Sequence, residues 1–318
     1  MSLPLETLRT IVTAVGALSC LGAATHLASV LWLFARPSSI HRYLNTKDGK
    51  PAWALVTGAS GGIGGQLAHE LALLGFNVVL HGRNQEKLDA TSRRLAEAHP
   101  DRQFRSIIID ASQAFTAAET SSSWVATLQD INLTVLINNA GGTTERKMAP
   151  VDGLTAERLI TDVSVNSIFP MLLIHQVIPL LEKNPNGLII NIGSLADLGV
   201  PLGGSYPASK AFLATMTEVL SREMRLLGRN IEVLAIRVGN VHGTNNSGFE
   251  EKDLFSPDAP SMAKAVIARV GCGRHVVVGH WRHALQFEIV NCLPKFVVDH
   301  FLTNVTSGFK DNKSGKDE

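Results

Sequence analysis

A glycine-rich turn between a short apolar run and an amphipathic stretch constrains this chain more than any other feature. Residues 56–72 have the sequence VTGASGGIGGQLAHELA. Glycine lets the backbone turn tightly and approach a phosphate, and a pyrophosphate bound there rests on the N-terminus of the following helix. The strand–turn–helix setting favours a dinucleotide-binding turn over a glycine turn chosen for packing. The candidate binding residues of this turn are Gly58, Ser60, Gly62, Ile63 and Gly64.

The rest of the chain alternates short apolar runs with longer amphipathic stretches. The apolar runs cover residues 52–57, 77–81, 105–110, 133–138, 187–193, 231–237 and 275–279. Helix-length segments lie between most of them, at 62–75, 84–98, 155–182 and 206–228. Apolar strands separated by helices are typical of a parallel sheet covered on both faces. We therefore expect an α/β doubly wound parallel sheet (Rossmann fold), with its ligand site at the carboxyl ends of the strands.

The N-terminus carries an uncharged apolar segment. Residues 10–35 lack formal charge between Arg9 and Arg36, and about 20 apolar residues suffice to cross a bilayer. The segment is long for a signal peptide, and Arg36-Pro37 is a poor cleavage site. A membrane anchor is therefore favoured over a signal peptide and over a buried soluble helix. A helix lying in the membrane interface would have the same signature. Basic residues follow the segment, so the positive-inside rule predicts a cytoplasmic body. The expected division is an anchor and linker (1–50), a single catalytic domain (51–302) and a polar tail (303–318).

Composition excludes two other classes of site. The formal net charge of the 318-residue chain is only +1, which gives no indication of a nucleic-acid partner. The three cysteines (Cys20, Cys272 and Cys292) form neither a CxxC motif nor a zinc-ligand spacing. We therefore expect reduced thiols and no metal site.

The end of the second predicted strand distinguishes between the two nicotinamide cofactors. An acidic residue there would bind a ribose 2′-hydroxyl, whereas a basic residue would pair with a 2′-phosphate. The sequence is LHGRNQEKL, with Arg83 at the deciding position and no acid before Glu86. The planar guanidinium donates two hydrogen bonds at once to a phosphate, and Ser60 could donate another. NADP(H) is favoured over NAD(H), the alternative being that Arg83 is only a solvated loop charge.

The segment SYPASK (205–210) contains one of only two tyrosines in the chain. Tyr206 and Lys210 are four residues apart, so they share one face of a helix. The simplest explanation is a surface pair without function. Several further motifs, in chain order, argue for a catalytic pair instead.

Three motifs occur in a fixed order: TGASGGIG (57–64), NNAG (138–141) and YPASK (206–210). Three single polar residues, Asp110, Asn166 and Ser194, stand at suitable spacings among them. This pattern resembles the short-chain dehydrogenase/reductase family over residues 51–300. The resemblance implies that Asp110 bonds the adenine amino group, that Asn138 ties the central strands together, and that Ala140 borders the adenosine. It also implies that Asn166 holds a water and that Ser194, Tyr206 and Lys210 carry out the chemistry.

Physical chemistry gives the same assignment. Reducing a ketone requires a hydride at carbon and a proton at oxygen, and a free phenol with a pKa of about 10 is a weak acid–base group near neutrality. A lysine ammonium and an oxidised nicotinamide favour the phenolate and would lower that pKa. Ser194, at the end of a strand, can hydrogen-bond the developing alkoxide. We expect Tyr206 to donate the proton. We expect Lys210 to lower the pKa of Tyr206 and to hold the cofactor ribose.

One segment departs from the family pattern. After the sixth predicted strand the family usually has Pro-Gly, then a valine or isoleucine and a threonine. The chain has RVGNVHGT, with Val238 in place of the proline and Gly243 where threonine is expected. Val241 matches and is expected near the nicotinamide; the contribution of Thr244 stays open.

The ends of the domain resemble the membrane-bound branch of the family, which contains 17β-hydroxysteroid dehydrogenases and very-long-chain 3-oxoacyl-CoA reductases. This implies an endoplasmic-reticulum enzyme, NADPH as donor, and a lipophilic carbonyl substrate. The family also implies a homodimer. The alternatives are a ketoreductase of specialised (polyketide-like) metabolism, a soluble enzyme with a packed N-terminus, and a non-catalytic NADP-binding partner protein. Residues 281–302 could form a core helix, a pocket wall or a second membrane contact, and residues 242–262 are expected to close over the substrate.

Overall fold

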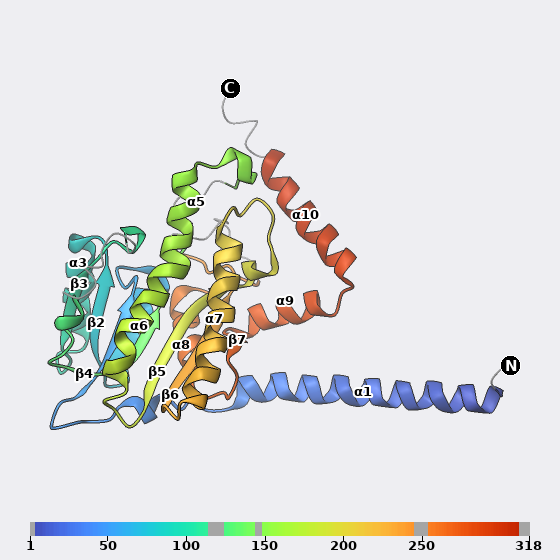
Figure 1. The fold of residues 1–318 in the computed structure, drawn as a ribbon, viewed down its shortest axis with the longest axis horizontal. Helices are drawn as coiled ribbons and strands as arrows, with labels where there is room; N and C mark the ends of the chain where they lie inside the picture. Colours follow the sequence, from blue (N-terminus) through green and yellow to red (C-terminus); the bar gives the residue numbers. More distant parts are fainter. Residues whose placement is uncertain (1–3, 114–123, 144–147, 245–253, 312–318) are drawn as a thin grey trace.

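A seven-stranded parallel sheet forms the centre of the protein (Figure 1). The computed structural model describes residues 4–113, 124–143, 148–244 and 254–311. The strand order is β3-β2-β1-β4-β5-β6-β7, which is that of a doubly wound sheet whose order reverses between β1 and β4. The strands are β1 (Ala52–Thr57), β2 (Asn77–Gly82), β3 (Phe104–Ile108), β4 (Asn132–Asn138), β5 (Gly187–Ser194), β6 (Ile231–Val238) and β7 (Val276–Val278).

Helices cover both faces of the sheet, and the predicted fold is confirmed. One apolar cluster joins the sheet to α2 (Gly62–Leu73), α3 (Gln85–Ala98) and α8 (Ala259–Ala268). The other joins it to α6 (Phe169–Leu181) and α7 (Tyr206–Leu226). Because β1, β2 and β4 are buried along their whole length, their sequences are continuous apolar runs rather than alternating ones.

The predicted helix over 155–182 is interrupted. Thr155 caps α5 (Ala156–Val163) by accepting a hydrogen bond from the Arg158 amide. A π-helical segment, η4 (Ser164–Ile168), then precedes α6. A π-bulge shifts the helix face and is frequent at functional sites. Here it contains Asn166.

The N-terminal helix α1 (Leu5–Ala35) projects from the body (Figure 1). It is long and apolar enough to cross a membrane, and no residue of its most apolar stretch is buried. The α5–α6 segment passes the same test but is half-buried in the core. The residues expected to form a linker are packed: the short helix η1 (Ile40–Tyr43) buries Ile40 and Tyr43, and the Tyr43 hydroxyl donates to Glu232 over 2.6 Å.

The C-terminal part adds α9 (Trp281–Asn291) and α10 (Lys295–Asp311) after β7. Helix α10 includes residues 303–311, which belong to the stretch expected to form a polar tail. Pro294 directly precedes the helix, a position that proline tolerates, and no proline follows it in the chain. Of the loop expected over the substrate, residues 245–253 lie outside the described residues.

Candidate active site

Three residues predicted to do the chemistry lie together at the carboxyl edge of the sheet. Ser194 is the last residue of β5, and Tyr206 and Lys210 occupy the first turns of α7. The Ser194 side chain is close enough to the Tyr206 hydroxyl to lower its pKa, and the Lys210 Nζ atom lies 5.7 Å from the centre of the Tyr206 ring. The fold thus converts a sequence spacing into a cluster of hydroxyl, phenol and amine.

Lys210 is held in a buried position. Only 4% of the residue is exposed, and its Nζ atom donates to the Ile192 carbonyl over 2.9 Å. Burial lowers the pKa of Lys210 to about 8, because a low-dielectric environment disfavours the charged form. This pKa still lies above neutrality, so the ammonium predominates at pH 7.

The pKa of Tyr206 is shifted upward, contrary to the expectation from sequence. Burial is the main cause; the hydrogen bond with Ser194 opposes it, and the negative charges of Asp197 and Asp162 add to it. The expectation from sequence rested on the charge of Lys210. Desolvation of the buried phenol disfavours the phenolate and raises the pKa instead. A raised pKa keeps the phenol protonated at neutral pH, which is the form that donates a proton.

A buried ion pair adjoins this cluster. Asp197, three residues after Ser194, accepts a 2.7 Å hydrogen bond from Arg237 Nε of β6. The Asp197 side chain is only 2% exposed, and burial raises its pKa while Arg237 opposes that shift. The Arg237 guanidinium lies 5.4 Å from the centre of the Phe287 ring of α9. Sequence analysis missed this pair, whose members are forty residues apart.

Asn166 joins the π-helical segment to the chain after β4. Its Nδ2 atom donates to the carbonyls of Gly142 (2.8 Å) and Asp162 (2.7 Å), and its Oδ1 atom accepts from the Gly142 amide (2.8 Å). A Cβ atom on Gly141 would lie 2.7 Å from Asn166 Oδ1 and 3.0 Å from Lys210 Nζ. Only glycine therefore fits between these two side chains. The water-holding role of Asn166 stays a prediction.

The glycine loop fits a pyrophosphate group. Gly58 and Gly62 have φ angles of +65° and +53°, a region that glycine occupies without strain. A Cβ atom on Gly64 would lie 2.2 Å from the Gly58 carbonyl oxygen, whereas one on Gly61 would meet open space. Helix α2 begins without a side-chain cap, so its first amides are available to an anion.

The other predicted cofactor residues border the same edge. Arg83 is exposed directly after β2. The exposed Asp110 accepts hydrogen bonds from the Ser112 amide (3.0 Å) and hydroxyl (2.8 Å). In the glycine loop, Ser60 and Ile63 are half-buried. Ala140, on the facing segment after β4, is also half-buried. A Cβ atom on Gly58 would lie 2.9 Å from the Ala140 Cα atom. Val241 is buried.

Two polar networks stiffen the edge. The predicted tie through Asn138 exists: Asn138 Nδ2 donates to Asn191 Oδ1 (2.8 Å), and Asn191 Nδ2 donates to Thr217 Oγ1 (2.9 Å). In the second network, Thr57 Oγ1 accepts from the amides of Asn139 (2.8 Å) and Ala140 (2.9 Å). Sequence analysis missed Asn191, Thr217, Thr57 and Asn139; a polar residue inside an apolar strand, such as Asn191 in GLIINIG, was the available signal.

His283 of α9 holds in place the segment after β6 that departs from the family pattern. His283 Nδ1 accepts from the Gly239 amide (3.2 Å), and its Nε2 atom donates to the Asn240 carbonyl (2.9 Å). A Cβ atom on Gly239 would lie 2.7 Å from the imidazole ring. Thr244, which the sequence left open, lies beside the glycine loop, 3.7 Å from the position of a Gly62 Cβ atom.

Comparison with known proteins decides the family. Residues 52–254 match the sequence profile of the short chain dehydrogenases. The chain belongs to the short-chain dehydrogenase family. Its predicted membership, its enzyme class as an oxidoreductase, and its use of a nicotinamide cofactor are thereby confirmed.

Relatives of this short-chain dehydrogenase have names from lipid chemistry. A very-long-chain 3-oxoacyl-CoA reductase of Caenorhabditis elegans is 33% identical over 260 residues, which are 81% of this chain and 80% of the relative. A reductase of the same name from Coprinopsis cinerea is 32% identical, over 81% of this chain and 76% of the relative. A C. elegans protein whose name proposes a steroid dehydrogenase is 28% identical, over 94% of both chains.

Solved structures share the fold. A metagenomic short-chain oxidoreductase in complex with NADP is 27% identical, with a TM-score of 0.57 over 71% of this chain and 96% of its own. A Sphingobium yanoikuyae short-chain dehydrogenase in complex with NADPH is 24% identical, with a TM-score of 0.63 over 76% and 92%. The likeness covers 71% and 76% of this chain rather than the whole of it.

Proposed function

We propose that this short-chain dehydrogenase is a membrane-anchored, NADPH-dependent reductase of a lipophilic ketone, either a 3-oxoacyl thioester or a steroid-like ketone. The observation that carries the proposal is the cluster of Ser194, Tyr206 and Lys210 at the same sheet edge as the glycine loop. The substrate class is supported by the names of the relatives.

In the proposed mechanism, the carbonyl carbon would receive a hydride, which is the chemistry that bound NADPH would supply. The Ser194 hydroxyl hydrogen-bonds the carbonyl oxygen, on which negative charge develops. Tyr206, which adjoins Ser194, would give the same oxygen a proton. The Lys210 ammonium then stabilises the phenolate that remains, and the same residue would hold the cofactor ribose. Asn166 keeps the segment beside Lys210 in place.

The cofactor preference follows from the charge after β2. Arg83 is exposed directly after β2. In this type of fold, the residue at that position faces the adenosine ribose. A guanidinium pairs with a 2′-phosphate through charge-assisted hydrogen bonds. Asp110 would bond the adenine, and Gly58, Ser60, Gly62, Ile63 and Gly64 would surround the pyrophosphate, with Asn138, Ala140 and Val241 supporting the pocket.

We expect Arg83→Asp to reverse the cofactor preference. The change removes the cation and adds a carboxylate that suits a ribose 2′-hydroxyl, so the ratio of kcat/KM for NADPH to that for NADH should fall about tenfold or more. Steady-state kinetics with both cofactors measure this ratio. Arg93→Asp, an equally exposed arginine on the following helix, is the matched control; an unchanged ratio in Arg83→Asp would contradict the assignment.

Asp197 gives a pH-dependent prediction. Its negative charge raises the pKa of Tyr206, and reduction requires the protonated phenol. Asp197→Asn removes that charge and leaves Arg237, so the pKa of Tyr206 falls and the alkaline decline of kcat/KM for ketone reduction moves to lower pH. Asp130→Asn is the matched control, because Asp130 also pairs with an arginine (2.6 Å to Arg105) but is exposed. A decline at the same pH in both variants would count against Asp197.

The membrane part of the proposal rests on α1. Residues 1–50 would act as anchor and linker to the catalytic domain of residues 51–302. The basic residues that follow α1 favour a body in the cytoplasm, and the endoplasmic reticulum is the compartment implied by the membrane-bound branch. Sedimentation of the full chain with microsomes, released by detergent but not by salt, is the expected result; recovery in the supernatant would contradict the anchor.

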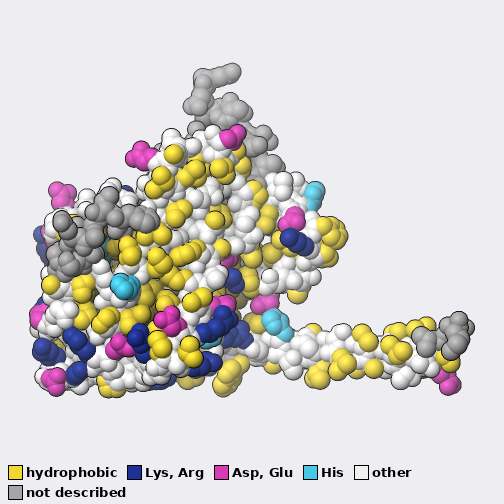
Figure 2. All heavy atoms as spheres, viewed as in Figure 1, with side chains coloured by type: hydrophobic (Ala, Val, Ile, Leu, Met, Phe, Trp, Pro, Cys, Tyr) yellow, Lys and Arg dark blue, Asp and Glu magenta, His cyan; other side chains and the backbone are white. Residues whose placement is uncertain are grey.

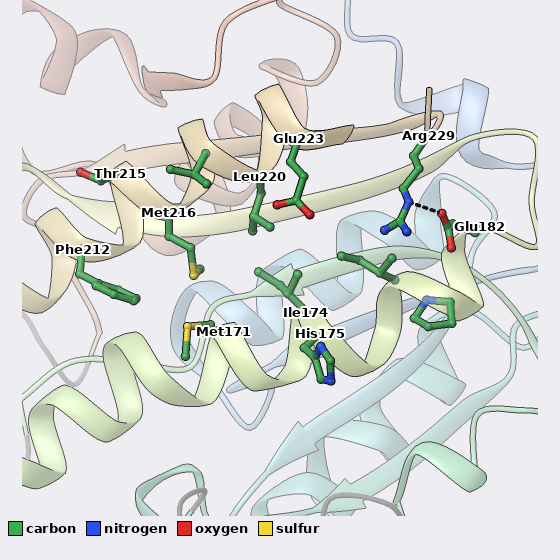
Figure 3. Close-up of a pocket in the computed structure, with 13 residues that line it drawn as sticks. Met171, Ile174, His175, Glu182, Phe212, Thr215, Met216, Leu220, Glu223 and Arg229 are labelled. Carbon is green, nitrogen blue, oxygen red and sulfur yellow. Dashed lines mark ion pairs between the residues drawn. The ribbon is translucent and has the colours of Figure 1, made fainter. Parts of the chain in front are cut away.

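A second copy of the chain is the proposed occupant of a groove between α6 and α7. The groove has a volume of about 650 Å³, and Figure 3 shows apolar side chains of both helices lining it, with the Arg229–Glu182 ion pair (2.7 Å) at one end. Phe212 and Val219 are 41% and 53% exposed there. Pairing through these helices is a family trait, and sedimentation of the detergent-solubilised chain as a monomer would contradict it.

Lipid analysis of cells lacking this chain tests the substrate class. Accumulation of 3-oxoacyl species would select the fatty-acid elongation step, whereas accumulation of a keto-steroid would select the second substrate class. A changed specialised metabolite with normal lipids would favour the ketoreductase alternative. Saturable NADPH binding with no turnover of any lipophilic ketone by the purified chain would favour a non-catalytic binder.

A further inference from the structure

The outward face of α9 carries a row of apolar side chains. Trp281, Leu285 and Ile289 recur every four residues, which places them on one face of the helix. They are 54%, 47% and 51% exposed. The opposite face is packed inward, with His283 and Ala284 buried. One face of α9 is therefore packed against the body, and its outer face is exposed.

The row continues into the turn that joins α9 to α10. Leu293 is 40% exposed and Phe296 is 74% exposed. We call Leu285, Ile289, Leu293 and Phe296 the apolar ridge. Figure 2 shows hydrophobic side chains gathered where this turn lies. Contiguous exposed apolar surface of this kind marks a protein or membrane contact more often than an ordinary surface.

Helix α1 is joined to α9 and to the chain before β7 by polar contacts. His26 Nε2 lies 2.8 Å from the carboxylate of Glu288, which directly precedes Ile289. Arg274 Nη2 donates to the Ser29 carbonyl over 3.3 Å and also to the Ser29 hydroxyl. In Figure 1 the turn between α9 and α10 extends farther along the direction of α1 than any other labelled element of the body.

The base of α1 is fixed to the body. Leu33 is buried, and its carbonyl accepts a 2.5 Å hydrogen bond from Arg269 Nη1. The Arg269 guanidinium stacks over the Phe34 ring at 4.4 Å. The Ser38 hydroxyl donates to the Ile267 carbonyl over 2.6 Å. The direction of α1 relative to α9 is therefore set by packing rather than by a flexible linker.

The length of the free part of α1 gives the level of a bilayer. From Thr10, the first residue after Arg9, to His26 the helix has 17 uncharged residues and is about 26 Å long at 1.5 Å per residue, which is within the range of lengths that cross a bilayer. A spanning α1 would thus place His26, and the ridge beside it, at the membrane surface. Trp32, which is 67% exposed, then lies in the interfacial zone where tryptophan is enriched.

We propose that the apolar ridge is a second membrane contact, which docks on the bilayer at the boundary between headgroups and acyl chains. The proposal rests on the proposed anchoring by α1. A lipid surface fits better than a protein partner because Glu288, next to the ridge residue Ile289, pairs with His26 at the level where α1 would enter the bilayer. Lys295, exposed next to Phe296, adds a cation for the phosphate headgroups. The body would then be held against the membrane at two places.

Single-cysteine fluorescence measures the docking. The full chain, with its native cysteines replaced by serine, is reconstituted into phosphatidylcholine nanodiscs and labelled with an environment-sensitive fluorophore at one site. The ridge site is Phe296→Cys. The surface control is Leu226→Cys, 84% exposed at the end of α7, and the anchor control is the native Cys20, exposed on α1. Each variant is exposed to spin-labelled phosphatidylcholine and, separately, to aqueous iodide, and NADPH binding verifies its fold.

We expect lipid quenching at positions 20 and 296 and iodide quenching at 226, with iodide quenching at 296 severalfold weaker than at 226. Lipid quenching at 20 with free iodide access at 296 would overturn the docking proposal and leave the anchor intact. Protection at 296 from both quenchers would overturn it in favour of a protein contact. Iodide access at all three positions would overturn both the docking and the anchoring.

Discussion

Replacing Tyr206 by phenylalanine should lower kcat about 10²–10⁴-fold, the usual contribution of a positioned general acid, while the dissociation constant for NADPH stays nearly unchanged. The change removes one hydroxyl from a cluster in which Ser194 adjoins it and Lys210 Nζ lies 5.7 Å from the ring centre. Steady-state kinetics with a lipophilic ketone, together with fluorescence titration of NADPH, separate the two effects. A variant with near-normal kcat would contradict the role of the phenol.

The chain contains a matched control for this variant. Tyr43 is the other tyrosine; it is buried and its hydroxyl donates to Glu232 over 2.6 Å, away from the sheet edge. Tyr43→Phe should cost about 1 kcal/mol of unfolding free energy for the lost hydrogen bond and leave kcat unchanged. The pair of variants separates loss of an acid from loss of a buried phenol hydroxyl.

Gly64→Ala should raise the dissociation constant for NADPH by up to about a hundredfold. The new Cβ atom would lie 2.2 Å from the Gly58 carbonyl oxygen, so the backbone of the loop must move. Overpacking of this kind costs about 1–3 kcal/mol, and the cost appears in affinity because the binding-competent loop is less populated. Titration of NADPH binding by fluorescence measures the change.

Gly65→Ala is the neighbouring control. A Cβ atom there would lie 3.4 Å from the Ala59 carbonyl oxygen, at the lower edge of ordinary contact, and alanine is favoured over glycine inside a helix by about 1 kcal/mol. We expect nearly normal NADPH affinity and unchanged or slightly increased thermal stability. Equal losses of affinity in the two variants would show that the loop tolerates no methyl group, and would remove the specific role of Gly64.

The sheet and the main site residues were accessible from sequence for a physical reason. Buried parallel strands are continuous apolar runs, so β1, β4 and β5 were recognisable to within a residue or two. The i, i+4 spacing of Tyr206 and Lys210 survives folding because both lie on one helix. Ser194 was placed correctly because a strand end in a parallel sheet determines which edge the residue occupies.

What sequence missed depends on burial and on distant partners. The upward shift in the pKa of Tyr206 comes mainly from desolvation, which residue spacing does not encode. His283 supports the turn at Gly239 from a helix more than forty residues later. The Asp197–Arg237 pair similarly joins two separate elements. The exposure of the apolar ridge, which decides between a core helix and a surface contact, is a property of the assembled fold.

The central claim is that this site passes a hydride and a proton to a lipophilic ketone. The most direct measurement uses NADPH deuterated at C4 of the nicotinamide, a long-chain 3-oxoacyl thioester, and mass spectrometry of the product formed by the reconstituted full chain. We predict a 3-hydroxyacyl thioester carrying deuterium at C3, formed by the wild type and greatly reduced in Tyr206→Phe. Saturable binding of NADPH with the ketone recovered unreduced would contradict the account.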